Sequence, residues 1–242
     1  MGDNQADSAL TILQEGEIEV KGKFLWGSNY TFLVEATHQG QALPAVYKPT
    51  RGERPLWDFP AASLAHREAA AYLVSEALEW HFVPETVYRR RGPLGPGSLQ
   101  RYIEHDPEIH YFSMDEIGRQ RLRPVALFDL LINNADRKGG HVILDQNHQL
   151  WLIDHGICFH VEDKLRTVIW DFSGEPIPAD LRASLAAFEK KLSLDEDLQV
   201  QLSRHLSKAE LRALAARAAE LLKMNSFPDP QPNRRPYPWP PL

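Results

Sequence analysis

The order of apolar and polar positions predicts strands through much of the first hundred residues. Runs with apolar residues at alternate positions, or rich in β-branched and aromatic residues, are typical of strands. Such runs lie at residues 17–25, 30–36, 45–47, 86–89 and 98–103. Apolar residues three and four apart predict a helix over residues 64–80, with Ser63 as its N-cap. Two prolines in residues 51–62 predict a loop before this helix.

The spacing becomes mainly helical beyond residue 103. Predicted helices cover residues 115–132, 179–192 and 208–224. Two short apolar runs, 142–144 and 150–153, flank a polar segment and predict a β-hairpin. Residues 226–242 are so rich in proline that neither a helix nor a central strand can form there. We expect this Pro-rich tail to be disordered or to wrap over the body of the protein in extended form.

This order of elements predicts an α+β protein with two lobes. Residues 1–103 are expected to form an N-lobe with an antiparallel sheet and one helix. Residues 104–225 are expected to form a mostly helical C-lobe that contains the hairpin, and residues 226–242 follow as the tail. A cleft between two such lobes is a natural binding site for a small ligand.

Composition and charge narrow the possible functions. The net charge of −6 argues against general nucleic-acid binding, which needs a basic face. Cys158 is the only cysteine, so an intrachain disulfide cannot form, and the cytoplasm is the expected setting. No stretch approaches the roughly 18 apolar residues of a membrane-spanning helix, so we expect no transmembrane segment.

The predicted hairpin carries the most informative chemistry. Asp136 lies in a polar loop before it, and His141 and Asp154 flank its two strands. Pairing of Val142 with Ile153 would bring His141 and Asp154 together at the open end, with Asp136 just beyond them. Phosphoryl transfer from ATP uses two carboxylates in this way. One orients the acceptor hydroxyl, and the other holds the metal ion on the phosphates.

Other interpretations of these residues remain open. Asp136 can stabilise a turn through local hydrogen bonds, whereas a charge such as Asp154 at the end of a buried strand is costly unless it is paired or binds a metal. Several histidines in this region suggest a transition-metal site: His141, His148, His155 and His160. A zinc site is disfavoured, because no tight His/Cys spacing supplies a third ligand beside His141 and Asp154.

The first lobe offers candidates for phosphate binding. Lys48 ends a short predicted strand, where it could contact ATP phosphates as a point charge. Glu68 in the following helix could pair with Lys48. Taken alone, each is more simply a solvent-exposed surface residue. Gly27 and Ser28 lie in a turn whose N–H groups could bind phosphate oxygens, although a plain hairpin turn explains them equally well.

Taken together, these residues resemble the phosphatidylinositol 3-/4-kinase-like superfamily. The similarity is to type II phosphatidylinositol 4-kinases and to small bacterial kinase-like proteins of that group. It runs from about Gly27 to Trp170. The motifs that carry it are, in order, AVYKP, HREAAAYLVSEAL with FVPET, GSLQRYIEH, NNADRKGGH and LIDHGICF. The resemblance implies a two-lobed fold similar to that of protein kinases.

The resemblance also implies a role for each motif of the first lobe. Lys48 would hold the phosphates of ATP, and Glu68 would be the partner that orients it. Main-chain groups near Gln100, Tyr102 and Ile103 would face the adenine ring. The glycine-containing turn is weaker than the phosphate loop of the family.

In the second lobe, the resemblance implies Asp136 as the catalytic base and Asp154 as a metal ligand. His141 stands where the family usually has asparagine as the second metal ligand. Histidine suits Mn²⁺ better than Mg²⁺, whereas the family's asparagine is an oxygen ligand. This difference leaves both metals as candidates and leaves open whether the protein is active. Arg137 or Lys138 could neutralise charge that develops on the transferred phosphoryl group.

The leading hypothesis is therefore a kinase, a metal-dependent enzyme that transfers a phosphoryl group from ATP. Its acceptor hydroxyl would belong to an unidentified lipid, small molecule or protein. The alternatives are a catalytically impaired nucleotide-binding pseudokinase and an enzyme that transfers the adenylyl group to a protein. The Pro-rich tail could also bind an aromatic-lined groove of a partner protein.

Overall fold

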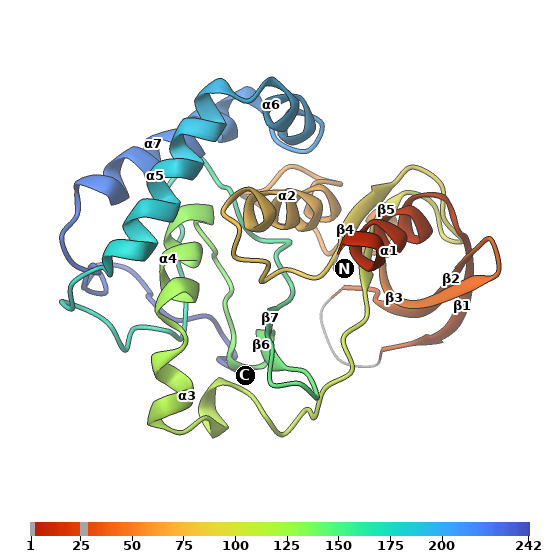
Figure 1. Cartoon of the computed structure of the whole chain (residues 1–242), viewed down its shortest axis with the longest axis horizontal. Helices are drawn as coiled ribbons and strands as arrows, with labels where there is room; N and C mark the ends of the chain where they lie inside the picture. Colours follow the sequence, from red (N-terminus) through yellow and green to blue (C-terminus); the bar gives the residue numbers. More distant parts are fainter. Residues whose placement is uncertain (1–2, 25–28) are drawn as a thin grey trace.

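A computed structural model describes residues 3–24 and 29–242 and has an α+β architecture. An antiparallel sheet lies on one side of the molecule, and most of the helices lie on the other (Figure 1). The strand order is β1-β2-β3-β5-β4, which places β3 at the centre. The strands are β1 (Glu17–Lys23), β2 (Phe32–His38), β3 (Gln41–Pro49), β4 (Thr86–Arg89) and β5 (Gly97–Arg101). The strands predicted in this part of the chain are thus confirmed, although β5 ends two residues earlier than expected.

Helix α1 (Asp3–Glu15) is an element that the sequence pattern did not predict. Its side chains Ile12 and Leu13 pack with Val34 and Leu99 of the sheet in a small separate core. Burial against the sheet stabilises this short helix, which would be marginal in isolation.

Helix α2 (Leu64–Ala77) starts at the predicted position but is capped differently. Ser63 makes no side-chain cap hydrogen bond to the helix. Instead, the carboxylate of Glu53 accepts hydrogen bonds from the N–H groups of Leu64 (3.2 Å) and Ala65 (3.0 Å). Ser63 therefore occupies the predicted N-cap position, but its side chain does not cap the helix, because an acidic side chain from the preceding loop satisfies the free N–H groups.

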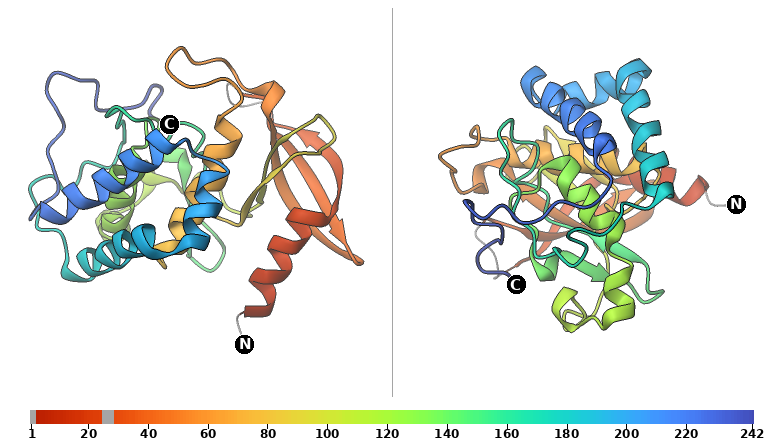
Figure 2. Two further views of the ribbon diagram at one scale, coloured as in Figure 1. Left: turned by 90° about the horizontal axis from the view of Figure 1, so that it is seen from above. Right: turned by 90° about the vertical axis from the view of Figure 1, so that its left-hand side faces the viewer.

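Helix α2 lies between the sheet and the later helices (Figure 2). Its buried Ala70, Ala71 and Val74 belong to the main hydrophobic core, which they share with residues of the helical part. The same helix also contacts β4 and β5. A side chain on α2 can therefore be held in place by both halves of the molecule.

The helical part contains α3 (Glu116–Gln120), α4 (Arg123–Ile132), α5 (Ala179–Leu194), α6 (Glu196–Ser203) and α7 (Lys208–Lys223). The single helix predicted over residues 115–132 is broken into α3 and α4. Pro124 lies in the first turn of α4, where its missing N–H and rigid ring are tolerated, whereas the interior of a continuous helix would exclude it. Short 3₁₀ turns cover Thr50–Gly52, Tyr111–Ser113 and Gly139–His141. In the described ranges, no helix combines the length and apolar character needed to cross a bilayer.

The predicted hairpin is present as β6 (Val142–Leu144) and β7 (Leu150–Leu152). Its register differs by one residue from the predicted pairing, because Val142 pairs with Leu152 rather than with Ile153. The N–H of Ile153 instead donates to the carbonyl of His141 at 3.1 Å. This extra hydrogen bond still brings the two ends of the hairpin together.

The Pro-rich tail wraps over the helical part without forming a helix or strand (Figure 2). The N–H of Thr167 donates to Pro236 O at 3.0 Å, and the N–H of Gly139 donates to Pro241 O at 2.8 Å. Of the two outcomes considered for the tail, the wrapped one is found. The tail therefore packs beside the loop that contains Asp136.

Candidate functional site

The centre of the candidate site is a lysine held between two carboxylates. Strand β3 positions Lys48, helix α2 positions Glu68, and Asp154 follows β7. The Nζ atom of Lys48 lies 2.5 Å from Oε1 of Glu68 and 2.8 Å from Oδ1 of Asp154. The side chain of Glu68 is only 3% exposed, whereas that of Asp154 is 47% exposed. The expected Lys48–Glu68 pair is thus present, and the open side of the group is the Asp154 side.

The charges of this group shift its pKa values. Burial alone would raise the pKa of Asp154. The charge and hydrogen bond of Lys48, together with the nearby histidines, outweigh burial and hold this pKa well below its usual range. Burial also works against the charge on Lys48, and the carboxylates of Asp154 and Glu68 reverse this effect and raise the pKa of the lysine. At Glu68 burial dominates and raises the pKa. Asp154 is therefore a permanent anion suited to binding a divalent cation.

The backbone at Asp154 is strained. Its φ angle of +62° lies in the left-handed region, which an aspartate adopts less readily than glycine. The next N–H, of His155, donates to Oε2 of Glu68 at 2.9 Å and stabilises this turn. Residues held in such conformations cluster at functional sites.

His141 lies beside Asp154, as the hairpin predicted. Its Nε2 is 3.3 Å from Oδ2 of Asp154, and its Nδ1 faces the N–H of Lys138 at 3.4 Å. Burial lowers the pKa of His141 to about 4, so the imidazole is neutral at pH 7. A neutral imidazole next to an ionised carboxylate is chemically able to share a metal ion with it.

Asp136 lies in the loop between α4 and β6. Its N–H donates to Oδ1 of Asn134 at 3.0 Å, and its Oδ2 lies 3.9 Å from Nζ of Lys138. Its side chain is 28% exposed. Burial raises the pKa of Asp136 to about 6 despite the nearby cation of Lys138. A carboxylate with such a pKa is better suited to accept a proton at neutral pH than an ordinary surface aspartate.

Arg137 does not point into the site, so the expectation that it contacts a phosphoryl group is wrong. Its side chain is fully buried and forms an ion pair with Asp129 at 3.0 Å. The same guanidinium donates to the carbonyls of His141 (3.3 Å) and Ile153 (3.1 Å) and lies 2.7 Å from Nε2 of His155. Arg137 therefore holds the two ends of the hairpin together, and Lys138 is the cation next to Asp136.

A cavity of about 240 Å³ adjoins Lys48 and Asp154. The expected adenine-facing residues Gln100, Tyr102 and Ile103 line it. Other lining residues include Val46, His141, Ile143 and Ile153. A smaller cavity shares Lys48 and Asp154 with it and extends to Glu68 and Asp136. The two cavities therefore adjoin at Lys48 and Asp154, where an extended ligand could contact both.

Main-chain hydrogen bonds limit which groups could face a base in this cavity. Gln100 is enclosed in the sheet, and its Nε2 donates to Oγ1 of Thr86 at 2.7 Å. The N–H of Tyr102 donates to Pro44 O at 3.0 Å. Because Pro44 has no N–H, it returns no hydrogen bond to the carbonyl of Tyr102. Of the main-chain groups expected to face adenine, only the carbonyl of Tyr102 and the groups of Ile103 therefore remain as candidates.

The sequence analysis did not identify Asp129 as a residue of the site. Two predicted residues lie outside the part of the chain that the structure describes. Asp129 is buried and accepts hydrogen bonds from Asn134 (3.0 Å) and Thr167 (3.1 Å) in addition to its pair with Arg137. The signal that could have revealed it is a lone carboxylate inside the apolar run of α4. The candidate phosphate-binding residues Gly27 and Ser28 fall outside the described residues.

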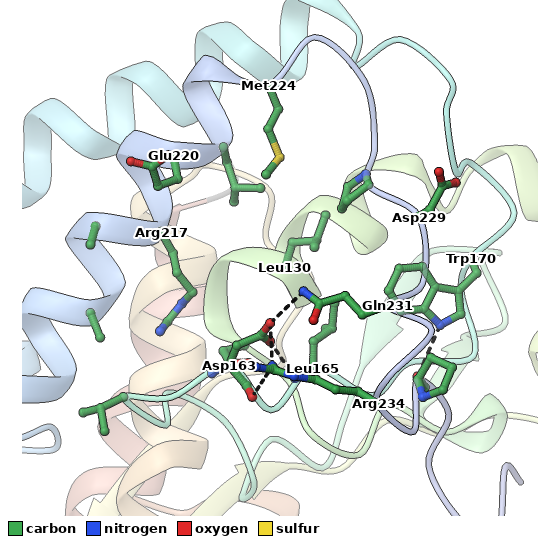
Figure 3. Close-up of a pocket in the computed structure, with 17 residues that line it drawn as sticks. Leu130, Asp163, Leu165, Trp170, Arg217, Glu220, Met224, Asp229, Gln231 and Arg234 are labelled. Carbon is green, nitrogen blue, oxygen red and sulfur yellow. Dashed lines mark hydrogen bonds and ion pairs between the residues drawn. The ribbon is translucent and has the colours of Figure 1, made fainter.

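Residues 3–24 and 29–242 contain no group of three or more His, Cys, Asp or Glu side chains that could hold a metal ion. Asp154 and His141 provide two ligands, which suits an ion that is also held by a bound phosphate chain and water. A larger cavity of about 380 Å³ lies elsewhere in the helical part and contains none of the site residues predicted from the sequence (Figure 3).

Comparison with known proteins establishes a family relationship. The chain is 39% identical to protein Rv2133c of Mycobacterium tuberculosis over an alignment of 269 positions, gaps included. The alignment covers 97% of this chain and 95% of that protein. The chain therefore belongs to the same family as Rv2133c. No family model matches the sequence.

Proposed function

We propose that the protein is an ATP-dependent phosphotransferase of the phosphatidylinositol 3-/4-kinase-like type, with a two-lobed kinase-like fold. The observation that carries the proposal is the position of Lys48 between Glu68 and Asp154, at the edge of a cavity lined by residues 100–103. In kinases a strand lysine pairs with a helix glutamate and contacts the phosphates, while an aspartate holds the metal. The geometry supports assigning these roles to Lys48, Glu68 and Asp154.

ATP would extend from the larger cavity toward the smaller one, past Lys48 and Asp154. Its adenine would contact the carbonyl of Tyr102 and Ile103, and its phosphates would approach Lys48. A divalent ion, Mg²⁺ or Mn²⁺, would bind Asp154 and His141. The separation of 3.3 Å between His141 Nε2 and Asp154 Oδ2 allows both atoms to contact one ion.

Asp136 would accept the proton of the acceptor hydroxyl. It lines the smaller cavity together with Lys48 and Asp154, on the side away from the adenine-facing residues. The cation of Lys138, 3.9 Å from Asp136, would stabilise charge on the transferred group. The proton passes from the acceptor oxygen to Asp136 as that oxygen bonds to the γ-phosphorus and the bond to ADP breaks.

A pseudokinase is the second candidate, and His141 is the observation that favours it. Histidine stands there in place of the asparagine that the resemblance leads us to expect as the second metal ligand, with its Nε2 at 3.3 Å from Oδ2 of Asp154. A protein that binds ATP without transferring phosphate would use the same cleft as a regulatory site.

Thermal unfolding with ATP and either Mg²⁺ or Mn²⁺ tests nucleotide binding. We expect ATP with metal to raise the Tm of the wild type and to have little effect on Asp154→Ala. The control variant is Asp229→Ala, an exposed carboxylate away from the cleft, which should respond like the wild type. If no nucleotide and metal combination shifts the Tm of the wild type, the proposal is rejected.

Incubation with ATP and candidate acceptors then separates the activities. A mass increase of about 80 Da on the product identifies phosphoryl transfer, and about 329 Da identifies adenylyl transfer. Binding of ATP without either product, across lipid, small-molecule and protein acceptors, would favour the pseudokinase.

A further inference from the structure

The cavity of about 380 Å³ in the helical part is separate from the candidate nucleotide cleft. Its walls come from α4, α7, residues 161–170 and the Pro-rich tail (Figure 3). It is open to solvent and is therefore a surface pocket rather than an interior void. Its volume falls in the range of small-ligand pockets, about 300–1,000 Å³.

Most of the cavity wall is apolar. The larger apolar side chains that line it are Leu130, Leu165, Trp170, Leu221 and Met224. Figure 3 shows Leu130, Trp170 and Met224 around one space, although they come from three segments. Such a surface favours an occupant with an apolar body, because contact removes apolar area from water.

Hydrogen bonds from the tail keep this space from closing. Arg234 forms an ion pair with Asp163 at 2.8 Å, and Nε2 of Gln231 donates to Asp163 at 3.3 Å (Figure 3). Nε1 of Trp170 donates to Pro236 O at 3.2 Å. These polar contacts hold the tail against residues 163–170. They would break if the tail moved in to close the cavity.

Among the described residues, one cationic side chain that lines the cavity forms no ion pair. Asp163 is neutralised by Arg234, and Glu220 pairs with Lys223 at 2.7 Å. Asp229 is exposed, and its carboxylate points away from the space enclosed by Leu130 and Trp170 (Figure 3). Arg217 is the remaining charged residue, and no ion pair within the described chain involves it.

Arg217 is held in place but lacks a counter-ion. Its Nε donates to Leu131 O at 2.8 Å, and one terminal nitrogen donates to His160 O at 3.2 Å. The other terminal nitrogen is buried and has no hydrogen-bond partner in the described structure. Burial lowers the pKa of Arg217 to about 10, which still leaves the guanidinium charged at pH 7. The negative charges of Asp163 and Glu210 act on this cation from beyond ion-pair distance. A bound anion would give the guanidinium a direct partner and offset the cost of its burial.

We propose that this cavity binds a small organic anion with an apolar body, such as a medium-chain carboxylate. The apolar body lies against Leu130, Trp170 and Met224, and the anionic group is directed to Arg217. This site is independent of the proposed nucleotide cleft. Its wall at residues 161–170 nevertheless reaches the loop of Asp136, because the N–H of Arg137 donates to Arg166 O at 3.0 Å.

Calorimetric titration with three probes that share one alkyl chain tests the head-group specificity. The probes are decanoate, decanol and decyltrimethylammonium, each used below its micelle concentration. Decanoate is expected to bind at least about tenfold more tightly than either of the other two, as one charge-assisted hydrogen bond implies. Equal binding of all three, or no binding of decanoate, would overturn the proposal.

Variants of α7 test the location. Ala213→Trp fills the cavity and should abolish decanoate binding, because Ala213 lines the wall. Arg217→Met should weaken it at least about tenfold, whereas Arg212→Met, an exposed arginine on the same helix, should leave it unchanged. Unaltered binding to Ala213→Trp would place the ligand elsewhere and reject the site, even if Arg217→Met fails to fold. Lys48→Met should bind decanoate like the wild type, which separates this site from the nucleotide cleft.

Discussion

Arg137 and Asp129 form an ion pair at 3.0 Å in which neither side chain is exposed. Asp129 lies on α4, and Arg137 lies in the loop that also carries Asp136. Through the same guanidinium, the pair reaches the carbonyls at both ends of the hairpin, His141 and Ile153. The position of the candidate metal ligands therefore depends on a buried ion pair that does not itself contact a substrate.

Removal of Asp129 should destabilise the protein strongly. Asp129→Ala leaves the charge of Arg137 buried without a partner, which typically costs about 3–5 kcal/mol. Urea unfolding followed by circular dichroism measures the change in the free energy of unfolding. Asp229→Ala is the control and should change it by less than about 0.5 kcal/mol. A similarly small effect of Asp129→Ala would contradict the structural role of the pair.

Lys48→Met should reduce ATP affinity by about 10- to 100-fold, because a charge-assisted contact to phosphate contributes about 1.5–3 kcal/mol. Glu68→Gln should have a smaller effect, since it keeps an acceptor for the N–H of His155. Fluorescent-nucleotide titration measures both. Lys21→Met, which breaks only a surface pair with Glu19 and Glu35, is the matched control. If Lys48→Met bound ATP as tightly as the wild type, Lys48 would not be a nucleotide-binding residue.

Asp136 should give the reaction a pH dependence. Its raised pKa of about 6 means that the basic form required for proton acceptance increases as pH rises through 6. The rate of phosphoryl transfer should rise over this range, and Asp136→Asn should abolish turnover while it retains ATP binding. A rate independent of pH between 5 and 7, as a range about one unit either side of that pKa, would argue against this role.

The same pKa shift should also be visible in stability. The folded protein holds the Asp136 proton up to about pH 6, whereas the unfolded chain loses it near the ordinary value of 3.8. Between these values the folded state binds more protons, so this group makes the protein less stable as pH rises. The Tm of Asp136→Asn relative to the wild type should therefore increase from pH 4 to pH 6, and a constant difference would count against the shifted pKa.

His141 should set the metal preference. A neutral imidazole binds Mn²⁺ better than Mg²⁺, so ATP should stabilise the wild type more with Mn²⁺. His141→Asn supplies an oxygen ligand and should shift the preference toward Mg²⁺. Thermal shifts with each metal measure this change. His148→Asn, at the exposed hairpin tip, is the control and should keep the wild-type order. An unchanged order in His141→Asn would exclude the histidine as a ligand.

Much of the fold was readable from local patterns. The strands of the sheet, helix α2, the hairpin and the long helices α5 and α7 all lie where the spacing of apolar residues predicted them. The break between α3 and α4 could also have been read from Pro124. Helix α1 could have been read from the helical spacing of Ala9, Leu10 and Leu13, although its packing against a sheet formed by later residues could not.

The candidate site was predictable to a more limited extent. Lys48 and Glu68 are 20 residues apart, and a strand followed by a packed helix was sufficient to expect their contact. The hairpin likewise predicted the approach of His141 and Asp154, even with its register displaced by one residue. Arg137 was assigned wrongly, because sequence does not indicate whether an arginine beside a catalytic aspartate points to solvent or to a buried partner.

The sequence by itself determined the type and order of most elements, and which side chains could carry chemistry, because periodicity and turn residues act locally. Only the tertiary structure decided which charges are buried and with whom they pair. Asp129 forms a buried ion pair with Arg137, and Glu53 caps α2. The tail forms one wall of the cavity beside Arg217. Arg137 and Asp129 are only eight residues apart, and Glu53 and Ala65 only twelve, so distance along the chain is not what hid these contacts. The free energy of each contact depends on burial that exists only after the whole chain has packed.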